Sequence, residues 1–187
     1  MVAIARSPGL TYEDLEKMPD DGRRYELIAG EIYVAASPSR AHQEVILRLI
    51  DASRPFVRDR RLGEVIVAPF DVRLSEQDVV QPDILSVSNE RLGILRENHT
   101  VGAPDLVVEV LSPSTSGRDE GAKLALYAAH GVREYWLADS YAARPTFRAL
   151  ALTPERVRML PQDGDIVRSE VLPGLAIDVA ALFRNLP

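Results

Sequence analysis

The spacing of hydrophobic residues divides this chain into helical and extended segments. Apolar positions three and four residues apart predict a long helix from about residue 40 to residue 57, with Val45, Ile46, Leu49 and Ile50 on its buried face. From Glu64 the period changes, and apolar runs predict strands over residues 64–74, 79–87, 106–111 and 134–139. The polar turn at 75–78 predicts that the first two of these strands pair as a hairpin. The polar stretch 88–103 predicts a helical turn or two.

Shorter elements are predicted at both ends of the chain. Thr11 followed by Asp14 is typical of a capped short helix, and residues 24–28 and 31–35 flank Ala29-Gly30 as a hairpin would. Beyond residue 140, the pattern predicts strands near 146–152, 156–160 and 166–171, and then an apolar tail at 177–183.

A helix between two central strands sets the predicted topology. Ser116 and Asp119 have the spacing of a capping box, and Gly131 is a typical helix end, so a helix should run from residue 116 to about residue 129. The order strand, helix, strand favours a right-handed parallel crossover. We therefore predict one α+β domain over residues 1–187, with an N-terminal hairpin at 22–36, a core at about 38–140, and C-terminal strands and tail at 141–187.

Two carboxylates interrupt the apolar strands. Strand alternation places Asp83 on the same face as Leu85, and Glu109 on the same face as Val107. An ionised carboxylate among valines is unfavourable unless a cation or hydrogen-bond donors hold it. If the two strands are neighbours, both acids can bind one Mg²⁺, with Mn²⁺ as a substitute, and such an ion would activate water at a phosphate ester.

Lys123 on the following helix would complete this site. It is one of only two lysines among 22 basic residues, and lysine provides a compact point charge that arginine does not. One turn into the helix, its ammonium could orient the attacking water or neutralise developing charge. Glu44 on the first long helix is a candidate accessory ligand, and Tyr127, four residues after Lys123, is a candidate accessory side chain. The hypothesis is metal-assisted phosphodiester hydrolysis.

Each of these residues also has a simpler interpretation. Asp83 could pair with an arginine, and Glu109 could belong to a structural ion pair. Lys123 could pair with Asp119 one helical turn away, and Tyr127 could be an aromatic at the edge of the core. The chain has no cysteine, three widely spaced histidines, and none of the common phosphate-loop, serine-hydrolase or zinc-protease motifs.

The amino-acid composition also limits the classes of protein to which this chain can belong. The 187 residues are 46% hydrophobic and 27% charged, as in ordinary globular proteins. The net charge of -6 argues against a protein that coats nucleic acid, although it permits a local basic cleft. No apolar run approaches the length of a membrane span, and no basic segment followed by an apolar one opens the sequence, so the cytoplasm is the expected location.

Several motifs in a fixed order resemble the Uma family of restriction endonuclease-like proteins, in the PD-(D/E)XK nuclease superfamily. They are Pro82-Asp83, residues 107–115 (Val-Val-Glu-Val-Leu-Ser-Pro-Ser-Thr), Arg118-Asp119, Lys123, Tyr127 and residues 131–139, with further likeness at 22–31 and 68–74. The resemblance covers about residues 11–140. It implies a core of a helix, a three-stranded meander, a crossover helix and a parallel fourth strand.

The resemblance also implies roles. Asp83 and Glu109 would be the metal-binding acids, and the substrate would be DNA. Where the superfamily usually has its lysine, two residues after the second acid, this chain has Leu111, so Lys123 would replace that lysine from the helix. Two alternatives stay open: a non-catalytic binding or regulatory protein on a nuclease scaffold, and a hydrolase of another phosphate ester. A homodimer would cover apolar strands such as 65–67 and the strand containing Trp136, but the sequence does not decide this.

Overall fold

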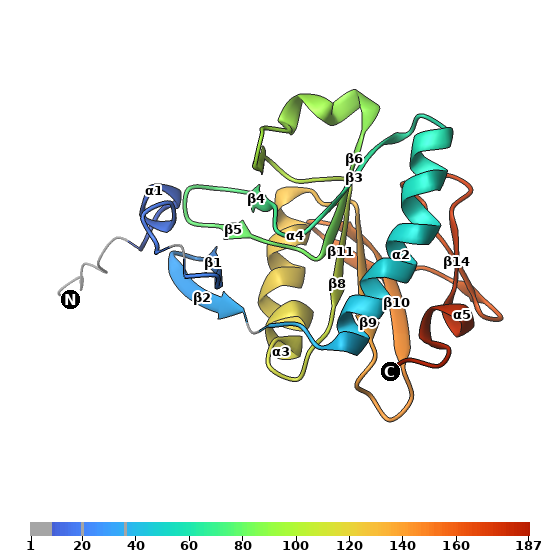
Figure 1. Ribbon diagram of the computed structural model, residues 1–187. Helices are drawn as coiled ribbons and strands as arrows, with labels where there is room; N and C mark the ends of the chain where they lie inside the picture. Colours follow the sequence, from blue (N-terminus) through green and yellow to red (C-terminus); the bar gives the residue numbers. More distant parts are fainter. Residues whose placement is uncertain (1–8, 20, 36) are drawn as a thin grey trace.

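The computed structural model describes residues 9–19, 21–35 and 37–187 (Figure 1). Its largest sheet has six strands in the order β11-β10-β9-β8-β6-β3. Their bounds are β3 Gly63–Val67, β6 Ile84–Ser88, β8 Leu106–Val110, β9 Glu134–Asp139, β10 Thr146–Thr153 and β11 Arg156–Met159. Strands β3, β6 and β8 pair antiparallel in sequence, and β9 pairs parallel with β8. The predicted meander with a parallel fourth strand is therefore confirmed.

Helices cover both faces of this sheet (Figure 1). Helix α2, Arg40–Asp59, begins at Ser39, whose Oγ accepts a hydrogen bond from the His42 backbone N–H at 3.2 Å, close to the predicted start. Alternation along β8 sends Val108 and Val110 into the core with α2, and Val107 into the core with the crossover helix. The face of β8 that bears Glu109 is therefore the face of the crossover helix.

The crossover helix is not the single regular helix that the sequence predicts. It consists of α3 (Ser116–Arg118), a π-helical turn η2 (Asp119–Lys123) and α4 (Leu124–His130), and it ends at Gly131 with a φ of 89° as predicted. The predicted capping box is wrong, because the helix begins at Ser116 itself. The N-cap position belongs to Thr115, which makes no side-chain cap hydrogen bond.

Both long strands of the predicted central hairpin break in the middle. Residues 64–74 divide into β3 and β4 (Asp71–Arg73), and residues 79–87 divide into β5 (Val79–Val80) and β6. Each break contains a proline, Pro69 or Pro82, which has no N–H to donate to a sheet. The hairpin therefore pairs twice, β3 with β6 in one sheet and β4 with β5 in another. Asp83 lies at the second break.

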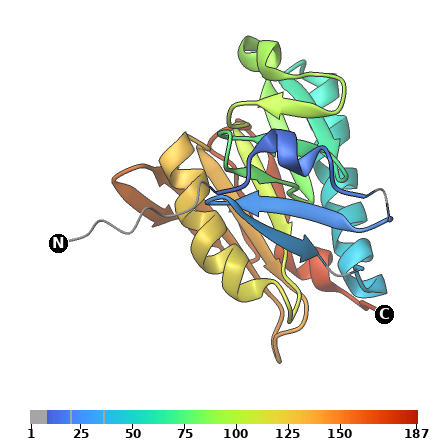
Figure 2. The same ribbon diagram turned by 90° about the vertical axis from the view of Figure 1, so that its left-hand side faces the viewer.

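A second sheet has the order β2-β1-β5-β4-β7. It contains the predicted hairpin, β1 Arg24–Ile28 and β2 Glu31–Ala35, joined at Ala29 and Gly30, whose positive φ values of 52° and 77° suit a tight two-residue turn. Residue 36, the predicted end of the hairpin, lies outside the described residues. Figure 2 shows the hairpin crossing in front of the six-stranded sheet, between α2 and α4.

Short elements complete the N-terminal half. Helix α1, Tyr12–Leu15, carries the predicted cap, in which the Thr11 N–H donates to Asp14 Oδ2 at 3.0 Å. The polar stretch after β6 forms the predicted helical turn η1, Asn89–Ile94. It also contains strand β7, His99–Val101, which the sequence does not predict and which pairs parallel with β4.

The C-terminal segment returns to cover the α2 side of the large sheet. It forms a third sheet of β12 Gln162–Asp163, β13 Ile166–Arg168 and β14 Ala176–Asp178, followed by helix α5, Val179–Phe183. Trp136 in β9 is 1% exposed within its own chain, so a dimer is not needed to cover it, whereas Val67 on the edge strand β3 is 47% exposed. Nowhere in the described ranges is there a helix long and apolar enough to cross a membrane.

Candidate active site

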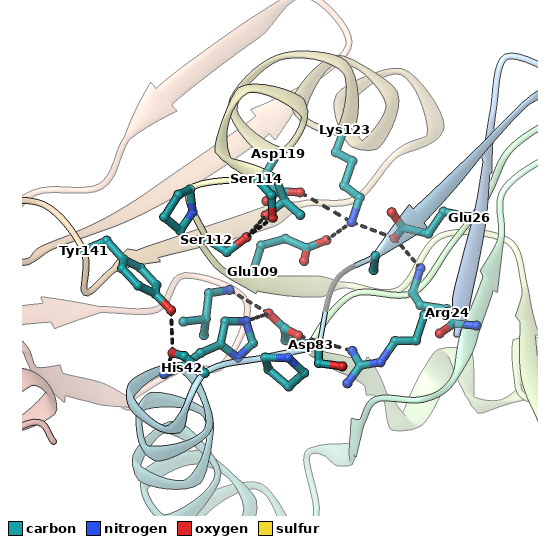
Figure 3. Close-up of a pocket in the computed structure, with 18 residues that line it drawn as sticks. Arg24, Glu26, His42, Asp83, Glu109, Ser112, Ser114, Asp119, Lys123 and Tyr141 are labelled. Atoms are coloured by element: carbon teal, nitrogen blue, oxygen red, sulfur yellow. Dashed lines mark hydrogen bonds and ion pairs between the residues drawn. The ribbon is translucent and has the colours of Figure 1, made fainter. Parts of the chain in front are cut away.

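A pocket of about 220 Å³ opens where the two larger sheets and the crossover helix meet (Figure 3). Strand β1, the start of α2, the bend at 81–83, the end of β8 and the first turns of the crossover helix all contribute to its wall. Its charged lining residues are Arg24, Glu26, Asp83, Glu109, Asp119 and Lys123. Segments distant in sequence thus bring four carboxylates to one place.

Asp83 and Glu109 come from neighbouring strands, as the sequence predicts. The ladder between β6 and β8 pairs Ile84 with Val108, so Asp83 lies one residue beyond the ladder, at the level of Glu109. Asp83 Oδ2 accepts the Val110 backbone N–H at 2.8 Å, which continues the contact between the two chain segments. The two acids are 5% and 4% exposed. They converge on the same pocket (Figure 3).

Lys123 points into this pocket from the crossover helix. Its Nζ lies 2.9 Å from Glu109 Oε1, 2.7 Å from Glu26 Oε1 and 3.5 Å from Asp119 Oδ1. The π-helical turn, a form that often occurs at functional sites, contains both Asp119 and Lys123. The simpler interpretation of Lys123 as the ion-pair partner of Asp119 is therefore correct too, but this contact is the longest of the three.

These charges perturb one another strongly. Burial raises the pKa of Glu109 well above its usual value, and the neighbouring Asp119, Asp83 and Glu26 raise it further, although Lys123 opposes them. Burial alone would lower the pKa of Lys123, but Glu109, Glu26 and Asp119 outweigh it and raise that pKa. The lysine is consequently a firmly protonated ammonium in a pocket with an excess of negative charge.

Asp83 is held by groups other than a close arginine. His42 Nε2 lies 3.2 Å from Asp83 Oδ2, and the nearest guanidinium, that of Arg24, is 3.7 Å from Asp83 Oδ1. Within the described part of the chain, the buried Nδ1 of His42 has no hydrogen-bond partner. The carboxylate is thus fixed through one oxygen by the Val110 N–H and His42, and among the described residues its other oxygen has only the distant Arg24.

The two accessory candidates have different outcomes. Tyr127 is fully buried, and its hydroxyl donates to Glu109 Oε1 at 3.0 Å, so it supports the second acid directly. Glu44 does not line the pocket. Its carboxylate pairs with Arg48 one turn along α2 at 2.8 Å, because the surface of a helix brings residues i and i+4 together. The structure therefore does not bring Glu44 together with Asp83 and Glu109.

Sequence reasoning missed three residues of this site, Arg24, Glu26 and His42. Glu26 belongs to the hairpin, where a charged residue in a strand is ordinarily solvent-exposed, yet it is only 3% exposed. His42 precedes Val45 and Ile46 by three and four residues, so it lies on the buried stripe of α2. That spacing was a detectable signal.

The donor atoms suit a hard divalent cation. Glu109 Oε1 accepts from Lys123 and Tyr127, whereas Glu109 Oε2 accepts no hydrogen bond from any described residue. Together with Asp83 Oδ1, it offers carboxylate oxygen to the pocket. Across the described ranges, no set of three or more His, Cys, Asp or Glu side chains is arranged to hold an ion. Magnesium fits this limit, since it is commonly held by one or two carboxylates and several waters.

An antiparallel meander with a parallel fourth strand, two acids near its strand ends and a lysine on the crossover helix together define a restriction endonuclease-like fold. A crystal structure described as a putative nuclease belonging to DUF820, from Anabaena variabilis, is similar with a TM-score of 0.77 and 20% sequence identity, over 93% of this chain and 97% of that one. At that identity the likeness establishes the fold alone.

Sequence comparison assigns the family. The family model described as "Uma2: Putative restriction endonuclease" matches residues 12–180, and the chain belongs to this family. The chain is also 29% identical over 147 residues to a Synechocystis sp. protein named "Uncharacterized protein slr1290", covering 73% of this chain and 75% of that protein.

Proposed function

We propose that this protein is a magnesium-dependent nuclease that hydrolyses phosphodiester bonds in DNA. Asp83 and Glu109 would hold the metal, and Lys123 would act beside it. The observation that carries the proposal is the convergence of these two buried acids with a buried ammonium in one open pocket. Membership of a restriction endonuclease-like family supports DNA as the substrate.

The residues of the pocket have distinct tasks in such a reaction. A divalent cation would supply acidification of water and stabilisation of charge on the phosphoryl oxygens. Lys123 Nζ is protonated and can only donate, so it orients water and stabilises developing charge and does not remove a proton. Arg24 lines the pocket with a partly exposed guanidinium and would contact a phosphate. The oxygen of water bonds to phosphorus while the bond between phosphorus and the leaving oxygen breaks. The water loses one proton to solvent, and the leaving oxygen takes one proton up, so the step balances.

One observation favours a second candidate, a non-catalytic binding protein on the same scaffold. Glu109 Oε1 already accepts from both Lys123 and Tyr127, and Asp83 Oδ2 from Val110, so a purely structural charge cluster would make the same contacts. The nuclease and the non-catalytic binding protein differ in what they require of the two carboxylate oxygens that accept none of these hydrogen bonds. Only the nuclease needs Glu109 Oε2 and Asp83 Oδ1 to bind a cation.

A paired experiment separates these candidates. Calorimetric titration with Mg²⁺ and Mn²⁺ should detect binding to the wild type, and cleavage of single- and double-stranded DNA should depend on either ion. An Asp83→Asn, Glu109→Gln double variant should lose both properties. Glu44→Gln should retain both, because the Glu44 carboxylate lies outside the pocket. Wild type that binds no ion, or that cleaves no DNA beyond the double variant, would refute the nuclease proposal. Nucleotides in place of DNA test the third alternative, another phosphate ester.

A further inference from the structure

The N-terminal hairpin contributes a carboxylate to the centre of the pocket. Glu26 in β1 lies 2.7 Å from Lys123 Nζ, the shortest of the three carboxylate contacts of this ammonium. The nuclease core supplies Glu109, whereas Glu26 comes from the second sheet and approaches from another side (Figure 3). The Lys123 ammonium therefore contacts carboxylates from two different sheets.

Glu26 is itself firmly held. Its Oε1 accepts the Gln81 backbone N–H at 2.9 Å, and the Arg118 guanidinium lies 3.4 Å from its Oε2. Arg118 also stacks over the ring of Tyr33 at 4.7 Å, and Tyr33 is the residue directly opposite Glu26 in the hairpin. Glu26 and Tyr33 thus both contact Arg118, which lies on the crossover helix one turn before Lys123. This arrangement fixes the position of the Glu26 carboxylate.

A lysine that reaches the site from a helix needs such a contact. Its flexible four-carbon stem leaves the ammonium free to occupy several positions, and one carboxylate restrains it from one direction only. Glu109 pulls the ammonium towards β8, and Glu26 pulls it towards the hairpin. Small displacements of a catalytic group from its working position can lower a rate by about 10²-fold.

We propose that Glu26 is a positioning residue that fixes the Lys123 ammonium beside Asp83 and Glu109. The hairpin is then part of the reaction centre and not an addition to the nuclease core. As a statement about catalysis, the proposal rests on the proposed nuclease function. As a statement about the lysine, it can be tested without any substrate.

The catalytic test measures DNA cleavage by Glu26 variants under saturating metal. Glu26→Ala should lower kcat by about 10²-fold. The KM for DNA should remain close to that of wild type, because the Glu26 carboxylate is already engaged by Lys123, the Gln81 N–H and Arg118. Glu26→Gln keeps an acceptor for Lys123 and for the Gln81 N–H, so it should recover part of the loss. Glu64→Gln on the exposed edge strand β3 is the matched control and should match wild type. Wild-type kcat in Glu26→Ala would overturn the proposal.

The second test observes the ammonium directly by NMR. Because Lys17 and Lys123 are the only lysines, protein labelled with ¹⁵N-lysine should give one slowly exchanging ammonium signal, from the buried Lys123, which a Lys123→Met variant identifies. Glu26→Gln should shift this signal or speed its exchange with water, and Glu64→Gln should leave it unchanged.

The two readouts together separate the possible failures. If wild type cleaves no DNA, the proposed function fails, but the NMR comparison still decides whether Glu26 anchors Lys123. A Lys123 signal that is the same in wild type and in Glu26→Gln would overturn the anchoring, even if the activity of the variant falls. If Glu26→Ala does not fold, the isosteric Glu26→Gln provides both measurements.

Discussion

Replacing Lys123 with methionine should destabilise the protein in a pH-dependent way. Methionine keeps the length of the side chain but removes the ammonium, so Glu26, Glu109 and Asp119 remain buried together without the cation they share. Removing one partner of a buried ion pair typically costs about 3–5 kcal/mol. For a urea dependence of about 2 kcal/mol per M, this corresponds to a midpoint roughly 2 M lower at pH 8.

The loss of stability in the Lys123→Met variant should become smaller as the pH falls. Burial already raises the pKa of Glu109 and Asp119, and Lys123 is the group that lowers both, so the variant should have still higher values. An acid whose folded pKa lies above its unfolded pKa makes the folded state less stable as the pH rises between the two values. Protonation of these acids as the pH falls therefore reduces the loss of stability in the variant. Wild type changes less, because its lysine stays charged over this range.

Urea unfolding at pH 5 and pH 8, followed by the fluorescence of the single tryptophan, Trp136, measures both effects. Trp136 is buried in the core with α2, so unfolding exposes it to water. Lys17→Met is the matched control. The Lys17 side chain is 64% exposed, and its ion pair with Glu13 lies on the surface, where such pairs contribute little to stability. A Lys123→Met variant as stable as wild type at pH 8, or equally destabilised at both pH values, would refute the reasoning.

Three further predictions use the same unfolding assay. Glu134→Ala should lower the free energy of unfolding by about 3 kcal/mol. This buried carboxylate accepts hydrogen bonds from the Trp136 indole N–H at 2.6 Å and from backbone N–H groups of the C-terminal segment, so an unchanged urea midpoint would contradict its role. Tyr127→Phe should cost about 1 kcal/mol through loss of the hydrogen bond to Glu109, and a stabilised variant would argue against that bond. Leu49→Ala should cost about 2–5 kcal/mol, whereas the exposed Leu47→Ala on the same helix should cost almost nothing, and equal effects would contradict the assigned helix face.

Local patterns were sufficient to predict most of the secondary structure. The spacing of Val45, Ile46 and Leu49 predicts α2, and the alternation around Glu109 predicts which face of β8 it occupies, because side-chain direction follows directly from helix and strand geometry. The sequence indicates a bulge at Pro69, but the full strand breaks at Pro69 and Pro82 were not predicted. Each half of the broken hairpin joins a different sheet, and that choice depends on distant strands.

Most of the elements, and three of the residues that line the pocket, could be predicted from the sequence. These residues are Asp83, Glu109 and Lys123, because acids in apolar strands and a rare lysine are visible as exceptions to a local pattern. The place of Glu26 in the pocket, and of Glu44 outside it, became visible only in the folded chain. Both are charged residues in ordinary polar surroundings along the chain. What separates them is which surface each element buries, and burial is set by long-range packing between sheets, which no local periodicity records.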